Sequence, residues 1–131
     1  LGIDVLQCIH FHYIIFNYYQ SMQVFQNSKI VDDEEKKEVL LEIIADKYCR
    51  QIISSIVDGK KSVPKISKET NIPISTVYRK IQKLEEQKLL DITGLINDEG
   101  KKIFLYSSRI RSILSQFDSN SVTIQIITNY L

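Results

Sequence analysis

The feature that most constrains this chain of 131 residues is the stretch from residue 62 to residue 90, SVPKISKETNIPISTVYRKIQKLEEQKLL. It predicts a short helix, a tight turn and a longer helix. Ser62 can cap the short helix, and Pro64 falls in its first turn, where proline forfeits no hydrogen bond. The run Asn-Ile-Pro at 71–73 predicts the turn, because a proline pushes the residue before it into an extended conformation. The longer helix is expected over residues 74–87.

The longer helix separates apolar from polar side chains at 3.6 residues per turn. Its core face is expected to carry three apolar residues, Val77, Ile81 and Leu84. The opposite face carries polar side chains, Ser75, Arg79 and Gln82, flanked by Thr76, Tyr78 and Lys83. This division predicts a helix that packs on a core along one side and presents a polar strip along the other.

The polar strip has the residue types that read the major groove of DNA. Arginine can hold guanine or phosphate, glutamine suits adenine, and threonine meets the thymine methyl group. Lys80 and Lys83 are better placed to neutralise phosphate. We therefore predict a helix-turn-helix that contacts DNA, the alternative being the solvated polar face that most surface helices have.

Charge is distributed unevenly along the chain, although the net charge is only +1. Residues 1–59 contain five Lys or Arg and nine Asp or Glu, whereas residues 60–111 contain twelve and six. A basic middle in a nearly neutral chain predicts a local phosphate-binding surface, to which Lys65 of the shorter helix would also belong. The alternative is an ordinary solvated surface.

A β-hairpin is predicted directly after the helix-turn-helix. Residues 89–93 and 102–106 have the composition of strands, and Asn-Asp-Glu-Gly at 97–100 predicts the turn between them. A hairpin in this position is the wing of a winged helix. Lys101 and Lys102 beside its tip are expected to contact the DNA backbone or minor groove, although the two acidic residues of the tip would repel phosphate.

A second hairpin is predicted at the C-terminus. Residues 122–128, VTIQIIT, form a clear strand pattern that needs a partner. Residues 109–117 have helical spacing, but the turn sequence at 118–121 favours a strand paired with 122–128. This hairpin would either extend the wing sheet or build a dimer interface.

The helix-turn-helix is preceded by a predicted helical scaffold over residues 31–59. The acidic run at 32–35 suits a helix N-terminus. The apolar stripe comprises Leu40, Ile43, Ile44, Tyr48, Ile52 and Ile56. The scaffold is either one long helix or two helices joined near Asp46, which could cap the second, and Gly59 is expected to stop it. Cys49 lies beside the stripe and is expected to be a buried apolar residue.

The first 30 residues are aromatic and β-branched in part and predict a strand or an apolar helix. Their polar residues argue against a membrane span. Cys8, His10 and His12 would share one face of a strand, which suggests a metal site, but a packed or disordered segment fits the bulky neighbours better. Because the only methionine is Met22, one interpretation is that the natural chain starts later and that residues 1–21 have no evolved role.

Three runs together resemble the winged helix-turn-helix regulators of archaea called ArsR-like: DKYCRQIISSI at 46–56, the stretch at 62–90, and GKKIFLYSSRIRSI at 100–113. The resemblance covers roughly residues 40–130 and implies that the helix near Ser75 enters the major groove. It implies DNA contacts by Ser75, Thr76, Tyr78, Arg79 and Lys83. Metal-sensing members carry a cysteine pair in the first helix of the motif; here that helix reads PKISKET.

The expected fold is therefore α+β: a winged helix-turn-helix with a three-helix core, a β-hairpin wing and an additional C-terminal β-hairpin. The expected division is an N-terminal extension at 1–30, a DNA-binding domain at 31–107 and a C-terminal hairpin extension at 108–131.

The expected function is sequence-specific transcriptional regulation in the cytoplasm, by a homodimer that binds double-stranded DNA and no membrane. The alternative is a winged-helix protein-interaction module in a transcription or other nucleic-acid assembly. No catalytic constellation, phosphate loop or metal cluster is evident, so neither an enzyme nor a cofactor is expected. Two cysteines in no metal-binding spacing favour a reducing compartment.

Overall fold

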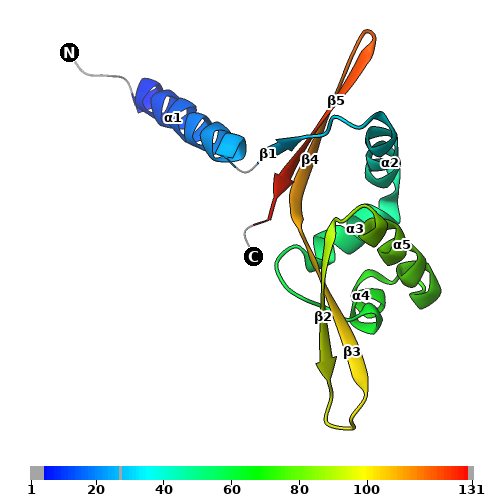
Figure 1. The fold of residues 1–131 in the computed structure, drawn as a ribbon. Coiled ribbons are helices and arrows are strands. Elements are labelled where there is room, and N and C mark those ends of the chain that lie inside the picture. Colours follow the sequence, from blue (N-terminus) through cyan, green and yellow to red (C-terminus); the bar gives the residue numbers. More distant parts are fainter. Residues whose placement is uncertain (1–4, 27, 130–131) are drawn as a thin grey trace.

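The structure is a computed structural model that describes residues 5–26 and 28–129 (Figure 1). Its elements, in chain order, are α1 (Val5–Gln26), β1 (Ser28–Ile30), α2 (Glu34–Ala45), α3 (Lys47–Ile56), α4 (Val63–Thr70), α5 (Ile74–Glu86), β2 (Leu90–Ile96), β3 (Lys102–Ser108), β4 (Ile110–Asp118) and β5 (Ser121–Thr128). The fold is of the α+β class. A winged helix-turn-helix formed by α3, α4, α5 and the β2–β3 hairpin is joined to a second, three-stranded sheet.

The predicted scaffold is two helices, because Asp46 interrupts it. Asp46 has extended backbone torsions, and its carboxylate accepts hydrogen bonds from the backbone nitrogens of Tyr48 and Cys49 at 2.9 and 3.4 Å. This is an N-cap of α3. Asp33 caps α2 in the same way, accepting from the backbone nitrogen of Glu35 at 3.0 Å.

Two details of the predicted scaffold are wrong. Tyr48 is 42% exposed, because α3 turns Cys49, Ile52 and Ile56 toward the core instead. Gly59 does not stop α3 as a left-handed cap: the helix ends at Ile56, and the φ of Gly59 is not positive.

The helix-turn-helix forms as its sequence predicts. Ser62 caps α4 and accepts a hydrogen bond from the backbone nitrogen of Lys65 at 3.4 Å. Asn71 ends α4 in the left-handed region, with φ 58°. Ile72 is buried in the turn, and the Ser67 hydroxyl donates to its carbonyl oxygen at 2.6 Å. The turn is therefore held both by burial and by a side-chain hydrogen bond.

One hydrophobic core joins the helices to both sheets. Helices α2–α5 contribute fully or almost fully buried side chains, among them Leu40, Ile52, Ile66, Val77 and Leu84. The strands contribute a second set, which includes Leu90, Ile110, Ile124 and Ile126. Such shared burial fixes the relative positions of the helix-turn-helix, the wing and the C-terminal sheet.

The wing is an antiparallel pair in which Leu90 lies opposite Ser108 and Ile96 opposite Lys102. Its turn is closed by a hydrogen bond from the Gly100 nitrogen to the Asn97 oxygen at 2.9 Å, with Gly100 at φ 77°. At the base of the wing, Lys61 forms an isolated bridge with Tyr106. The wing is thus tied to the segment that leads into α4.

The C-terminal residues form the predicted second hairpin, with Phe117 opposite Val122. Of the two arrangements considered, extension of the wing sheet is wrong, because β4 and β5 form a separate sheet of order β1–β5–β4. The three residues of β1, which the sequence left within the N-terminal extension, pair antiparallel with β5. Figure 1 shows β3 running almost directly into β4, so that one long stretch of chain serves both sheets.

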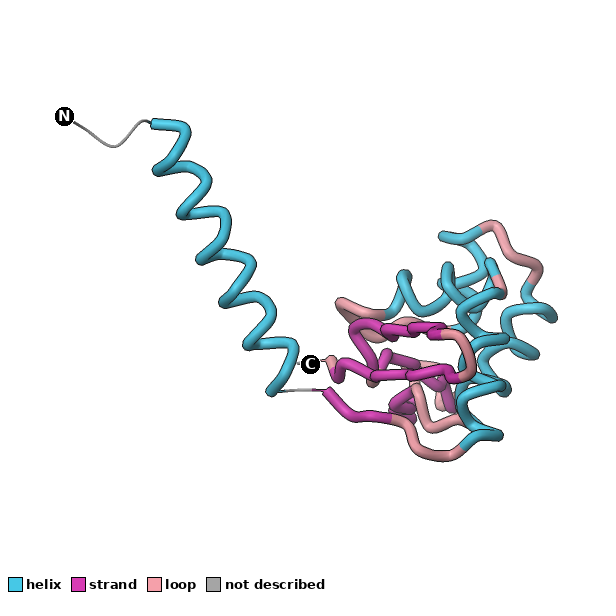
Figure 2. Tube along the Cα trace, turned by 90° about the horizontal axis from the view of Figure 1, so that it is seen from above, coloured by secondary structure: helices cyan, strands magenta, loops and turns pink. Residues whose placement is uncertain are grey.

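Helix α1 settles the choice between strand and helix for the N-terminal segment, and it lies apart from the other elements (Figure 2). Residues two apart lie on opposite sides of a helix, so His10 faces away from Cys8 and His12. The described residues contain no group of three potential metal ligands. Within the same residues, no helix is long and apolar enough to cross a membrane. Residues 1–4, 27 and 130–131 of the two predicted extensions lie outside the described ranges.

Candidate nucleic-acid interface

The outer face of α5 is the centre of the candidate interface. Val77, Ile81 and Leu84 are at most 2% exposed, and they fix the rotation of the helix about its own axis. The opposite face consequently points to solvent. Its exposed polar residues are Ser75, Arg79 and Gln82. Thr76 is half-buried at the edge of this strip, and Tyr78 is exposed on its other flank.

Tyr78 also borders a groove of about 380 Å³ between α5, the start of α4 and the wing. The groove brings together three residues predicted separately for DNA contact, Tyr78, Lys101 and Lys102. Ser62 and Pro64 line it from the N-terminus of α4, the positive end of the helix dipole. A phosphate-bearing ligand in this groove would meet two ammonium groups and a helix N-terminus, and also the carboxylate of Glu99.

The wing presents both attractive and repulsive charges. Lys101 and Lys102 are exposed, and the Lys102 ammonium lies 5.1 Å from the centre of the Phe104 ring, within the range of a cation–π contact. Asp98 and Glu99 are exposed at the tip. The side of the wing near α4 and α5 is therefore mixed in charge, because Glu99 lines the same groove as Lys101 and Lys102, and Asp98 adds a second carboxylate at the tip.

Lys80 and Lys83 differ from the other basic candidates because both are already paired. The Lys80 ammonium donates to the carboxylate of Asp46, and the Lys83 ammonium lies 3.0 Å from a carboxylate oxygen of Glu42. The hydrogen bond from Lys80 lowers the pKa of Asp46, and the hydrogen bond to Glu42 raises the pKa of Lys83. These pairs join α5 to the scaffold helices, and phosphate contact by either lysine would compete with them.

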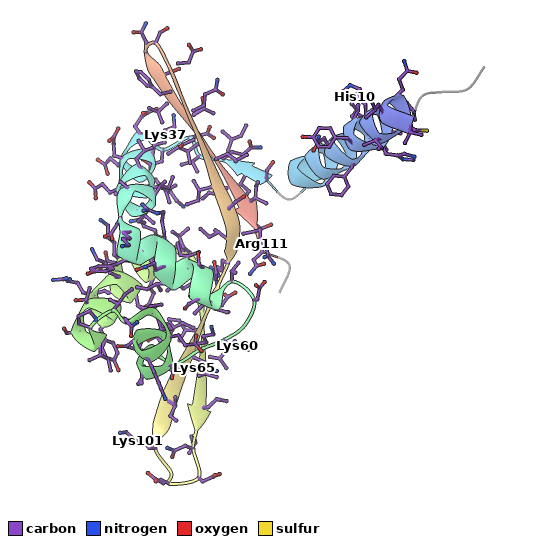
Figure 3. All side chains as sticks on the ribbon, turned by 180° about the vertical axis from the view of Figure 1, so that it is seen from behind. His10, Lys37, Lys60, Lys65, Lys101 and Arg111 are labelled. Atoms are coloured by element: carbon purple, nitrogen blue, oxygen red, sulfur yellow. The ribbon has the colours of Figure 1, made fainter. Side chains whose placement is uncertain are left out.

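Lys65 lies exposed on α4 (Figure 3). It is near an ion pair between α4 and the segment before it, in which the Lys61 ammonium is 2.6 Å from a carboxylate oxygen of Glu69. The hydrogen bond from Lys61, with a smaller contribution from the charge of Lys65, lowers the pKa of Glu69. Figure 3 places Lys65 and Lys101 at the same end of the molecule, away from α1.

Sequence reasoning missed three residues that line the groove with these lysines: Ser62 and Pro64, which it treated only as helix-starting residues, and Phe104, which it treated only as part of a strand. Phe104 is 46% exposed, on a strand whose other residues near the core are buried. The signal that could have identified Phe104 as a groove residue was a large aromatic side chain two positions from Lys102 in the predicted wing.

Several solved structures match part of the fold of this chain. NolR from Sinorhizobium fredii is 20% identical over 56% of this chain and 69% of its own, with a TM-score of 0.46. A homodimeric winged helix-turn-helix DNA-binding domain, Mb0332 from Mycobacterium bovis, described as a possible ArsR-family transcriptional regulator, is 16% identical over 56% of this chain, with a TM-score of 0.46. The match spans 64% of that domain, which is less than two thirds of its length.

A possible transcriptional regulator from Methanosarcina mazei is 18% identical over 63% of this chain and 76% of its own, with a TM-score of 0.47. No protein-family model matches the chain, and a search of curated proteins gave no match.

Proposed function

We propose that the chain is a sequence-specific DNA-binding transcriptional regulator that inserts α5 into the major groove and acts as a homodimer. The observation that carries this proposal is the exposed polar strip of Ser75, Arg79 and Gln82 on a helix whose other side is fixed by buried residues. A recognition helix needs this combination, because base contacts require side chains held in a defined orientation.

The groove beside α5 supports the same proposal. The phosphate backbone that borders the DNA major groove would be held by Lys101, Lys102 and the N-terminus of α4. We assign base reading to Arg79, Gln82, Ser75 and Thr76, and backbone contact to Tyr78, Lys65, Lys101 and Lys102. Lys80 and Lys83 would contact phosphate only by giving up their ion pairs, so we place them last.

We include a homodimer because one recognition helix alone rarely gives enough affinity for a specific DNA site. One recognition helix covers a single half-site, and two half-sites one helical turn apart are read by two copies related by symmetry. The resemblance to archaeal regulators suggests that the chain comes from an archaeon and acts in the cytoplasm. We include the archaeal origin and the cytoplasmic location in the proposal.

The decisive experiment is selection of bound sequences from a random pool of double-stranded DNA, followed by binding measurements on the enriched site. Arg79→Ala should weaken binding to that site by about tenfold or more, while binding to random DNA changes far less. Lys29→Ala, which removes an exposed lysine on β1, is the matched control and should leave both affinities unchanged.

The wing contributes a separate readout. Lys101→Ala and Lys102→Ala should each lower the slope of log affinity against log salt concentration by about one, without changing the preferred sequence. Failure to enrich any motif, together with a flat salt response, would instead favour a protein-interaction module.

A further inference from the structure

The edge of β4 that faces away from β5 has no role in the proposed function. Among the described residues, β4 pairs with β5 alone and therefore forms one edge of its sheet. Alternate residues of such an edge direct backbone N–H and C=O groups outward, ready to pair with another strand. The other edge of this sheet is only the three-residue strand β1.

Beyond the bulge between Ile110 and Ser112, this edge lacks the features that keep sheet edges from associating. Residues 112–117, SILSQF, contain neither proline nor a charged side chain. They carry two exposed apolar side chains instead, Leu114 at 47% and Phe117 at 76% exposure. A nine-residue strand with these properties is expected to pair with a strand of another chain.

Phe117 lies on the side of the sheet that faces the core, but beyond the point that the core reaches. Ile113, Ser115 and Phe117 point to the same side, since alternate residues of a strand do so. Their partners on β5 are Ile126, Ile124 and Val122. Ile113 packs against the core, whereas Phe117, four residues further on, remains exposed.

We propose that β4 pairs antiparallel with β4 of a second copy of this chain, with Ser115 opposite Ser115 of the partner subunit. The two sheets would then form one six-stranded sheet, β1–β5–β4–β4–β5–β1. In this register Phe117 lies opposite Ile113 of the partner subunit, so that each exposed phenylalanine covers an isoleucine that already borders the core. An aromatic residue opposite a β-branched residue is a favourable cross-strand pair.

Symmetry restricts the register. A two-fold axis perpendicular to the sheet keeps each side of the sheet on the same side in both copies, so directly opposite residues must both be odd or both be even in number. Pairing of 113 with 117 and of 115 with itself meets this condition. The axis also leaves both sets of helices on one side of the joint sheet, and this contact uses the same patch on both copies.

The charges at the two ends of β4 favour this direction of pairing. Arg111 stands at one end and Asp118 at the other, so antiparallel copies place opposite charges at each end of the strand pair, whereas parallel copies place like charges there. In the proposed register Asp118 lies opposite Ser112 of the partner subunit, one position from Arg111, so the attraction is one of neighbouring charges and leaves the hydrogen bond from Arg111 to Asp58 at 3.2 Å in place. This inference rests on the proposed homodimer, but it is tested without DNA, so its failure would leave DNA reading by α5 untouched.

The first experiment measures the mass of the full chain by sedimentation equilibrium. The wild type should sediment at about twice 15.2 kDa. Phe117→Asp should weaken self-association by about tenfold or more, because it places a carboxylate against Ile113 of the partner subunit. The matched control is Ile96→Asp in the wing, where Ile96 is 77% exposed, and it should leave the association constant unchanged.

The second experiment tests the register by disulfide formation, in a Cys8→Ser background that removes the exposed native thiol. Residues directly opposite in an antiparallel pair have Cα atoms about 4.5–5.5 Å apart, within the range of a disulfide. Ser115→Cys should therefore form a covalent dimer under mild oxidation. Ser121→Cys, at a serine on β5 that is also exposed, should remain a monomer on denaturing gels.

Helix α1 is the alternative dimer contact to be tested, because its apolar residues are also exposed. The double variant Phe11→Asp/Phe16→Asp should dimerise as the wild type does. A monomeric wild type, an absence of cross-linking at residue 115, or loss of the dimer in the α1 variant but not in Phe117→Asp would overturn the proposal.

Discussion

Lys80 in α5 donates a hydrogen bond to the carboxylate of Asp46, which is also the residue that caps α3. The same carboxylate accepts from the backbone nitrogen of Tyr48 at 2.9 Å. One side chain thus starts a scaffold helix and holds the candidate recognition helix against it. The hydrogen bond from Lys80 is the largest cause of the lowered pKa of Asp46, which shows that the surroundings favour its charged form.

Replacing Asp46 should separate these two roles. Asp46→Ala removes both the cap and the ion pair and should lower the free energy of unfolding by about 1–2 kcal/mol. Asp46→Asn keeps a good cap and loses only the charge, so its cost should be smaller. Urea unfolding followed by circular dichroism measures both. Asp32→Ala, an exposed aspartate just before α2, is the control and should fall within about 0.5 kcal/mol of the wild type.

The contribution of Asp46 should also depend on pH. Its pKa is lower in the folded chain than its ordinary value of 3.8, so the unfolded state binds more protons between the two values. The extra stability of the wild type over Asp46→Asn should therefore be fully present above pH 3.8 and decline as the pH falls through the folded pKa. Unfolding free energies measured from pH 7 down to pH 3 would contradict this if the difference grew on acidification.

Local signals in the sequence were sufficient to predict helix caps and turns, because neighbouring residues determine where these begin and end. Ser62 and Asp46 stand where their side chains reach the first backbone nitrogens of a helix, and Gly100 takes the positive φ that the wing turn needs. The spacing of Val77, Ile81 and Leu84 likewise predicted which side of α5 is buried. Each of these features depends only on neighbours along the chain.

The features that could not be predicted depend on residues far apart in the sequence. Strand β1 has three residues and exists because β5, about one hundred positions later, offers it an edge. The ion pair of Lys83 with Glu42 joins residues 41 positions apart, so no neighbouring residue in the sequence indicated that the Lys83 ammonium is paired. The exposure of Tyr48 and Phe117 follows from where the core ends, which periodicity does not encode.

Lys88 should be a site where glycine stabilises the fold. It follows α5 in the left-handed region, with φ 60°, and its nitrogen donates to the Glu85 oxygen at 2.8 Å while the Leu89 nitrogen donates to Leu84 at 3.1 Å. This pattern is a Schellman motif, in which glycine is the usual residue. Lys88→Gly should raise the free energy of unfolding by about 0.5–1 kcal/mol, because the strain of a side chain in this conformation disappears.

The contrasting variant is Lys68→Gly, within α4, where glycine should lower the free energy of unfolding by about 1 kcal/mol. Thermal and urea unfolding of both variants would test the assignment. Destabilisation in both would mean that the left-handed conformation of Lys88 carries no strain.

The two cysteines should differ sharply in reactivity. Cys49 is fully buried, and burial, followed by the nearby charge of Asp46, raises its pKa to about 11. At pH 8 only about one thousandth of it would be thiolate, the reactive form. Cys8 is exposed on α1. A thiol reagent should therefore modify one cysteine rapidly in the folded chain and the second only after denaturation, and Cys8→Ser should abolish the rapid phase.

Neutralising the wing tip should strengthen DNA binding if the wing approaches the backbone. Asp98 and Glu99 are exposed on either side of the turn's centre, next to Lys101. Asp98→Asn/Glu99→Gln should raise the affinity for any duplex several-fold at low salt and less at high salt, because the removed repulsion is screened. Fluorescence anisotropy at two ionic strengths measures this, and unchanged affinity at both would place the tip away from DNA.

The continuity of β3 and β4 ties the wing mechanically to the C-terminal hairpin. Only Arg109 separates the two strands; its nitrogen donates to the Leu89 oxygen at 2.9 Å, and its own oxygen accepts from the Asn129 nitrogen at 2.8 Å. Residues 102–118 are therefore one continuous segment held at Arg109, with the wing at one end and the sheet edge at the other. A displacement of β4 where two copies meet would reach the base of the wing directly through this segment of backbone.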